Sequence, residues 1–99
     1  MHDEAITEIG IDGEGRLYVR PSNSSFEHIY RTASGVRWDE EAGCLFAPVP
    51  RDWTQRRWLD RIVADVADEY RVRLRITAIT RWTGITPEAE LELRAATQS

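Results

Sequence analysis

The pattern of apolar and polar positions is most regular between Asp52 and Tyr70, where it predicts a helix. Apolar side chains recur there in one stripe of a helix with 3.6 residues per turn. Charged side chains occupy most of the other positions, so we expect one face of the helix to be buried and the opposite face to meet water. Asp52 is the predicted N-cap, and Gln55 completes a capping box. The apolar stripe comprises Leu59, Ile62, Val63, Val66, Ala67 and Tyr70.

Alternation with a period of two residues predicts strands before and after this helix. Residues 5–20 are typical of a β-hairpin that turns at Asp12-Gly13. Residues 36–47 are typical of a second hairpin, which turns at residues 41–43. The clearest strand is RVRLRITAI, residues 71–79. Its apolar positions, which we expect to lie under the helix, are Val72, Leu74, Ile76 and Ala78.

Capping signals predict two further helices. A capping box formed by Ser24 and Glu27 favours a short helix over residues 25–34. Thr86-Pro87, an N-cap followed by proline at the first helical position, favours a helical tail over residues 86–99. Leu91 and Ala95 share one face of that tail, whereas Leu93 lies elsewhere, so we expect the tail either to dock lightly or to contact a partner.

Together these elements predict one α+β domain over residues 1–99, in the order β-β-α-β-β-α-β-α. We expect a mostly antiparallel sheet of about five strands, with one long amphipathic helix packed across one face. A chain of 99 residues has room for one hydrophobic core. Residues 1–4 are polar and terminal, so we expect them to be frayed.

Composition narrows the class of protein. The chain is 41% hydrophobic and 30% charged, which is typical of a folded globular domain. It has neither an apolar run long enough to cross a membrane nor the basic and apolar start of a secretory signal, so we expect a cytoplasmic protein. Cys44 is the single cysteine, which excludes an intrachain disulfide and favours a buried, inert thiol.

The charge pattern argues against a general nucleic-acid binder. The formal net charge is -4, whereas affinity for nucleic acid depends on neutralising phosphates. All basic residues are arginines, which pair well with carboxylates. A codon bias toward arginine in a genome rich in G and C is the favoured explanation of that composition.

The sequence contains no recognisable catalytic, cofactor-binding or metal-binding motif. His2 and His28 have no further histidine or cysteine at ligand spacing, so no metal site is expected. Asp39, Glu40 and Glu41 are adjacent acidic residues in a predicted turn, where such residues are common. No glycine-rich phosphate-binding loop occurs. We therefore expect a protein without catalysis and without a cofactor.

A stripe of arginines is the most unusual feature. Arg71, Arg73 and Arg75 lie two residues apart on the predicted last strand and repel one another unless something answers their charge. One interpretation is ion pairing with Glu8, Asp39 or another acidic neighbour. The other is a basic patch that meets an acidic partner, with aromatic side chains beside it. On this second interpretation the predicted interaction surface comprises Arg71, Arg73, Arg75, Trp53, Trp82 and Tyr18.

Three segments carry a resemblance to a known family. They are FEHIYR at Phe26 to Arg31, VRWD at Val36 to Asp39, and Trp53 followed by the long amphipathic pattern. In these segments the chain resembles small bacterial proteins of unknown function from integron gene cassettes. Its layout of hairpins and one long helix is also similar to that of some immunity proteins of bacterial toxin systems. The resemblance implies an accessory protein of a mobile element that acts by binding, and it supplies no catalytic residues.

Three functional hypotheses follow. The first is a non-catalytic interaction protein whose partner is a second copy or another protein. The second is an immunity-type inhibitor that masks a basic toxin. The third is a small-molecule binding protein or enzyme with a pocket lined by Trp53, Trp82 and Tyr30. The acidic surface required by the second hypothesis comprises Asp60, Asp65, Asp68, Glu69, Glu88, Glu90 and Glu92.

Overall fold

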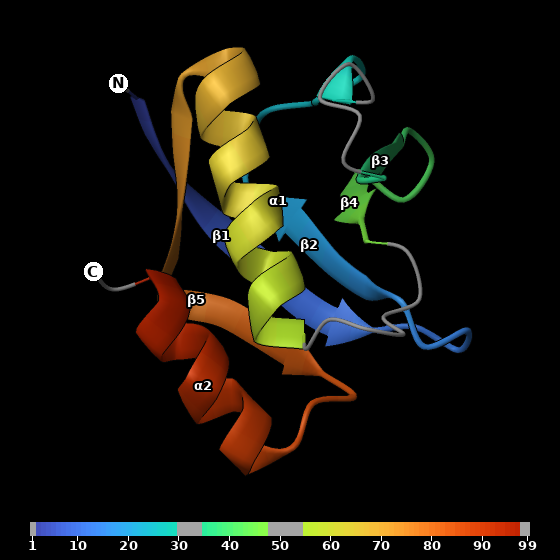
Figure 1. Cartoon of the computed structure of the whole chain (residues 1–99), viewed down its shortest axis with the longest axis vertical. Helices are drawn as coiled ribbons and strands as arrows, with labels where there is room; N and C mark the ends of the chain where they lie inside the picture. The colour runs from blue at the N-terminus through green and yellow to red at the C-terminus, as the bar shows by residue number, and fades with distance from the viewer. Residues whose placement is uncertain (1, 30–34, 48–54, 98–99) are drawn as a thin grey trace.

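A mixed sheet forms one layer of the molecule, and helices form a second layer over one of its faces (Figure 1). This computed structural model describes residues 2–29, 35–47 and 55–97. Within those residues there are five strands and two helices. In chain order they are β1 (His2–Ile11), β2 (Leu17–Pro21), β3 (Arg37–Asp39), β4 (Cys44–Phe46), α1 (Gln55–Tyr70), β5 (Val72–Thr83) and α2 (Pro87–Thr97).

The strand order across the sheet is β3-β4-β2-β1-β5. The pairs β1–β2, β2–β4 and β3–β4 are antiparallel, and β1–β5 is parallel. The predicted α+β class with a mostly antiparallel sheet is therefore confirmed. The parallel pair arises because the chain leaves β4 at one side of the sheet, crosses through α1, and returns as β5 beside β1.

Both predicted hairpins form, and an aspartate organises each turn. In the first, Asp12 Oδ1 accepts hydrogen bonds from the backbone N–H of Glu14 at 3.0 Å and of Arg16 at 2.8 Å. In the second, Asp39 Oδ1 accepts from the backbone N–H groups of residues 41 and 42 at 3.0 and 3.1 Å. A carboxylate that satisfies the amides of the next residues is the mechanism by which Asp favours turns.

The expectation of a frayed start is wrong for residues 2–4, which lie in β1. The His2 N–H donates to the carbonyl of Arg71, and β1 pairs with β5 from its first residue. Glu4 is buried, and its carboxylate accepts hydrogen bonds from the backbone N–H groups of Asn23 and Ser24 at 3.1 and 3.0 Å. A terminal strand that is paired and anchored in this way is held in place.

The predicted helix over residues 25–34 does not begin where the capping box places it. Residues 27–28 form a turn, and the Ile29 N–H donates to the carbonyl of Phe26 at 3.1 Å, a short-range bond of the 3₁₀ type. The hydroxyl of Ser24 donates to Glu4 on β1, so a distant carboxylate engages the predicted capping side chain. Residues 30–34 lie outside the described residues.

Two described helices, rather than the predicted single one, share one face of the sheet (Figure 1). The buried side of α1 includes Leu59, Ile62 and Val66, as its apolar stripe predicts, whereas Asp52 lies outside the described residues. The docking side chain of α2 is Leu93, which is 1% exposed, and Leu91 is 70% exposed. The predicted face of this tail is therefore wrong, because α2 turns Leu93 toward the core beside α1. No helix in the described part of the chain is long and apolar enough to cross a membrane.

The strand β5 is longer than predicted and contains a bulge. Alternation holds from Val72 to Ile76, but the register with β1 then shifts between Ile6 and Glu8. Thr80 fixes this bulge, because its hydroxyl donates to the carbonyl of Ile6 at 2.6 Å and accepts from the N–H of Thr77 at 3.0 Å. Ala78 is therefore exposed, and the expectation that it lies under the helix is wrong.

Candidate functional site

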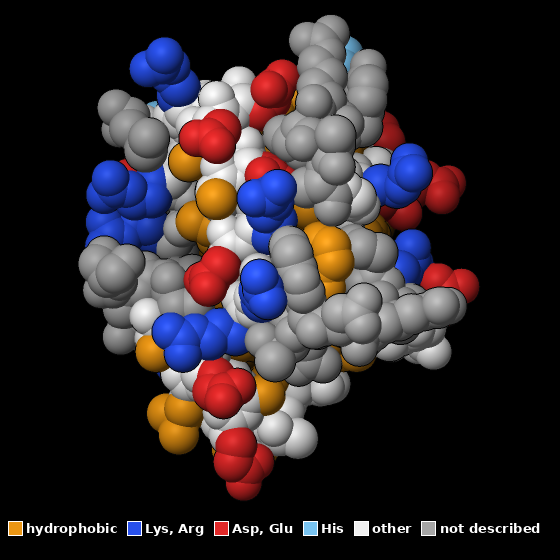
Figure 2. Space-filling view, in the orientation of Figure 1, with side chains coloured by type: hydrophobic (Ala, Val, Ile, Leu, Met, Phe, Trp, Pro, Cys, Tyr) orange, Lys and Arg blue, Asp and Glu red, His pale blue; other side chains and the backbone are white. Residues whose placement is uncertain are grey.

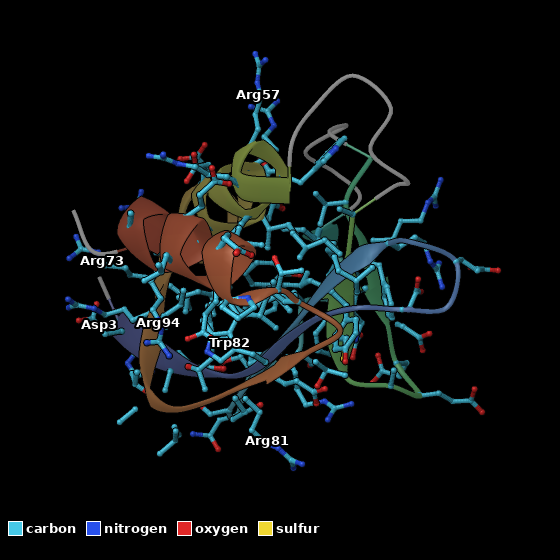
Figure 3. All side chains as sticks on the ribbon, turned by 90° about the horizontal axis from the view of Figure 1, so that it is seen from below. Asp3, Arg57, Arg73, Arg81, Trp82 and Arg94 are labelled. Carbon is cyan, nitrogen blue, oxygen red and sulfur yellow. The ribbon has the colours of Figure 1, made fainter. Side chains whose placement is uncertain are left out.

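The side of the sheet away from the helices carries most of the polar and aromatic chemistry, and we call it the open face. Figure 3 shows α1 and α2 on one side of the sheet and the Arg81 side chain pointing away from them. Side chains alternate between the two faces along a strand. Residues that are adjacent in sequence to core residues of a strand therefore lie on the open face. The open face comprises Asp3, Ala5, Glu8, Gly10, Tyr18, Arg20, Phe46, Arg73, Arg75, Arg81 and Thr83.

A carboxylate with three side-chain donors lies at the middle of the open face. Glu8 Oε2 accepts hydrogen bonds from the Tyr18 hydroxyl at 2.6 Å and the Thr83 hydroxyl at 2.8 Å. Glu8 Oε1 accepts from the Arg20 guanidinium at 2.9 Å. The bond from Tyr18 is the main cause that lowers the pKa of Glu8, and burial only partly opposes it. This carboxylate is therefore ionised at neutral pH and internally neutralised.

Tyr18 is held by the same cluster. Burial and the hydrogen bond to Glu8 raise the pKa of Tyr18, so the phenol stays protonated as the donor. Its ring centroid lies 5.8 Å from that of Phe46, on β4. The guanidinium of Arg16 lies 4.5 Å from the centroid of the Phe46 ring, within the range of a cation–π contact.

A glycine makes this arrangement possible. Gly10 is buried on β1 opposite Tyr18, and a Cβ at this position would lie 2.4 Å from the Tyr18 hydroxyl oxygen. The Tyr18 ring therefore lies against the bare backbone of Gly10. The sequence pattern does not mark Gly10, and it offers Glu8 only as one acidic neighbour for the arginine stripe. A glycine inside a strand is the signal that marks such a close approach.

The three arginines of the predicted stripe do not share one environment. Arg71 precedes β5 in a left-handed backbone conformation with φ 55°, so it ends α1 and does not lie on the strand. Arg75 pairs with Asp3 at 3.1 Å, which matches the ion-pairing interpretation with a different acidic neighbour from those named. Glu8 pairs instead with Arg20. Arg73 lies at the same end of the sheet as Asp3 (Figure 3).

The position of β5 in the sheet explains why arginines are found on this strand. Among the described strands β5 lies at the edge of the sheet, where an unpaired backbone can join another chain. Charged side chains and a bulge are two devices by which proteins protect such edges. Arg73, Arg75 and the bulge at Thr77–Thr80 therefore discourage edge-to-edge pairing along β5 and leave its flat side as the accessible surface.

The predicted aromatic members of the site are separated by the fold. Trp82 packs into the core on the side of α2, where the guanidinium of Arg94 lies 5.1 Å from the centroid of its ring (Figure 3). Trp53 and Tyr30 lie outside the described residues. Among the predicted surface residues, the structure therefore brings Tyr18, Arg73 and Arg75 onto one face and places Arg71 and Trp82 elsewhere.

A hollow of about 420 Å³ lies beside the β3–β4 hairpin. Trp38 lines it, and its indole Nε1 donates to Glu40 Oε2 at 2.9 Å. The other lining residues are Arg16, Gly35, Arg37, Asp39, Glu40, Phe46 and Ala47. Among the described side chains there is no group of three or more His, Cys, Asp or Glu that could hold a metal ion.

The acidic residues of the second hypothesis do not form one surface. Asp65 is 5% exposed and pairs with Arg61 at 3.6 Å. Glu90 pairs with Arg94 at 2.9 Å. Figure 2 shows acidic and arginine side chains interspersed over the side that α1 covers. The side chain of Asp65 is therefore removed from the predicted acidic surface.

The fold and the open face define a small α+β protein with two described helices on one side of a sheet and a polar, aromatic surface on the other. A family model described as Integron Cassette Protein Hfx_Cass5 matches residues 4–80, and the chain belongs to this family.

A solved structure supports the same assignment. It is the integron cassette protein Hfx_Cass5, from the mobile metagenome of North West Arm Sewage Outfall. It is 38% identical, the match covers 100% of this chain and 99% of that chain, and the TM-score is 0.50. The resemblance to integron cassette proteins is thus confirmed, whereas a similarity to immunity proteins is not shown. No curated protein matches.

Proposed function

We propose that this integron cassette protein acts by binding another protein chain through the open face. The observation that carries the proposal is the layout of the two layers, with both described helices on one side of the sheet (Figure 3). The opposite side carries Arg20, Arg73, Arg75, Arg81, Tyr18 and Phe46. Aromatic residues and arginine are enriched in protein interfaces.

The middle of the open face is suited to burial. Glu8, its central charge, already accepts from Tyr18, Arg20 and Thr83. A partner that covers the cluster would therefore not strand an unpaired charge, which is the usual cost of burying a carboxylate. The net charge of -4 supports a protein partner over nucleic acid.

A charge reversal tests this proposal. Arg73→Glu/Arg75→Glu changes the open face, and Arg56→Glu on the exposed side of α1 is the control. We expect the double variant to lose self-association measured by light scattering, or capture of proteins that copurify with the wild type, while the control keeps both. If the double variant folds and keeps both properties, the open face is not the binding surface.

The hollow beside β3–β4 favours a second candidate, the binding of a small molecule at Trp38 and Phe46. A ligand that binds only the native protein raises its melting temperature. We expect a metabolite that binds there to raise the melting temperature of the wild type and not of Phe46→Ala. A screen that leaves the wild-type melting temperature unchanged would rule out this candidate for the compounds tested.

A further inference from the structure

We infer that the partner on the open face is a second copy of this chain, stacked sheet against sheet so that each β5 lies over the β3–β4 hairpin of the other copy. The inference rests on the proposed binding function and names its partner. It follows from the distribution of charge between the two edges of the sheet.

One edge of the described sheet is basic. The strand β5 carries Arg73, Arg75 and Arg81 and has no acidic residue. All three arginines are exposed. Asp3 on the neighbouring strand answers one of them, Arg75, at 3.1 Å. The edge therefore keeps a net positive charge.

The opposite edge is acidic. The hairpin formed by β3 and β4 carries Asp39, Glu40 and Glu41 at its turn, against one arginine, Arg37. All four residues are exposed. The hollow of about 420 Å³ adjoins this turn, and Asp39 and Glu40 line it together with Arg16 and Arg37.

Two-fold symmetry brings unlike edges together. A rotation axis that runs along the strands, midway between two stacked sheets, exchanges the left and right edges of the sheet. Each β5 then faces the acidic hairpin of the other copy, and both contacts form at once, as a self-complementary two-fold interface requires. Stacking in this way needs no pairing along the protected edge of β5.

The middle of the open face fits the same geometry. The Tyr18 ring lies against Gly10, which has no side chain, so no side chain of residue 10 stands between the two edges. Tyr18 and Phe46 provide aromatic area there, with ring centroids 5.8 Å apart. Glu8 is already neutralised within its own chain, so the second copy does not need to answer its charge.

A charge-swap mixing experiment tests the inference. One variant, Arg73→Glu/Arg75→Glu, makes the β5 edge acidic, and the other, Glu40→Arg/Glu41→Arg, makes the hairpin basic. In a homodimer of either variant like charges face each other, so we expect each alone to dimerise at least about tenfold more weakly than the wild type at low salt. An equal mixture restores unlike charges at both contacts, so we expect a heterodimer by light scattering and by affinity capture of one tagged variant.

Several results would overturn the inference. Dimers that persist in both single-edge variants, or a mixture that stays monomeric although both variants are folded by circular dichroism, would do so. Arg73→Glu alone provides a milder test, because Arg73 makes no ion pair within the described part of the chain and its reversal breaks no such contact. A smaller weakening than that of the double variant is expected, and no weakening counts against the geometry.

A different result would rule out the proposed function than would rule out the second copy as partner. A wild type that is monomeric at every concentration rules out the second copy. In that case the capture comparison between Arg73→Glu/Arg75→Glu and Arg56→Glu still decides whether another protein binds the open face.

Discussion

Gly10 controls the shape of the open face although it has no side chain. The Tyr18 ring occupies the space in which a Cβ would lie, and its hydroxyl reaches Glu8 at 2.6 Å from that position. A side chain at residue 10 would displace the ring and break this bond. The geometry of the cluster therefore depends on one small residue in the middle of a strand.

We expect Gly10→Ala to lower the free energy of unfolding by about 1–2 kcal/mol, because the new methyl group displaces Tyr18 from its contacts. Urea denaturation measures this change. Gly13→Ala is the matched control, since a Cβ there meets nothing within 4 Å. In a Tyr18→Ala background the cost of Gly10→Ala should largely vanish, and an equal cost in both backgrounds would contradict the assignment.

Glu4 is the other carboxylate on which the fold depends. Burial raises the pKa of Glu4, but hydrogen bonds from Ser24 and Asn23 outweigh it, so the pKa is lowered overall. A lowered pKa in the folded state means that the carboxylate stabilises the fold above the unfolded pKa of about 4.3. That stability is lost as the pH falls through the folded pKa, which lies below this value.

We expect Glu4→Gln to reduce the free energy of unfolding by about 1–3 kcal/mol at pH 7, because the backbone amides of Asn23 and Ser24 lose a charged acceptor. The difference between wild type and variant should shrink as the pH falls below about 4.3. Urea denaturation at a series of pH values measures both effects. A difference that is constant from pH 7 to pH 3 would show that ionised Glu4 does not contribute to stability.

At the scale of elements, the junction between α1 and β5 is a single residue in a left-handed conformation. Arg71 alone separates the helix from the strand, and it adopts φ 55°. Its N–H donates to the carbonyl of Ala67 at 3.0 Å, and its carbonyl accepts from the N–H of His2 at 3.2 Å. This residue therefore caps the helix and starts the pairing of β1 with β5. Glycine is the residue that favours such a left-handed position.

We expect Arg71→Gly to raise the free energy of unfolding by about 0.5–1 kcal/mol, because glycine removes the steric cost of the left-handed conformation. Thermal or urea denaturation measures the gain. The oligomeric state should not change, because Arg71 lies outside the open face. A loss of stability would mean that the arginine side chain contributes more than its backbone conformation costs.

Elements with local signals could be predicted from the sequence. The two hairpins follow from Asp12 and Asp39 in their turns, and α1 follows from its apolar stripe. Local sequence patterns fail to predict the structure where a contact with a residue distant in the sequence determines it. Ser24 reads as a helix cap but donates to Glu4, and the alternation of β5 breaks where Thr80 bonds to Ile6. The strand order depends on such long-range pairs and has no local signal.

The candidate site was predictable only in part for the same reason. Arg73, Arg75 and Tyr18 were predicted from their residue types and do share the open face. Trp82 is of a residue type that is common in interfaces, but the register of β5 with β1 turns its side chain toward α2. Glu8 becomes central only because β2 and β5 both flank β1, which no pattern within residues 2–11 reveals.

At the scale of the whole molecule, the two faces of the sheet differ in what covers them. One face packs against α1 and α2, and the other displays the neutralised Glu8 cluster between a basic and an acidic edge. Both edges are polar and exposed, so their attraction is screened by salt. Association through the open face should therefore weaken as the ionic strength rises.

The most direct test of this account is the molar mass of the wild type by light scattering, across a range of concentrations at low and high salt. We expect a mass of twice 11.4 kDa at low salt, with dissociation toward 11.4 kDa as the protein is diluted or the salt is raised. A mass of 11.4 kDa at every concentration and salt would contradict it.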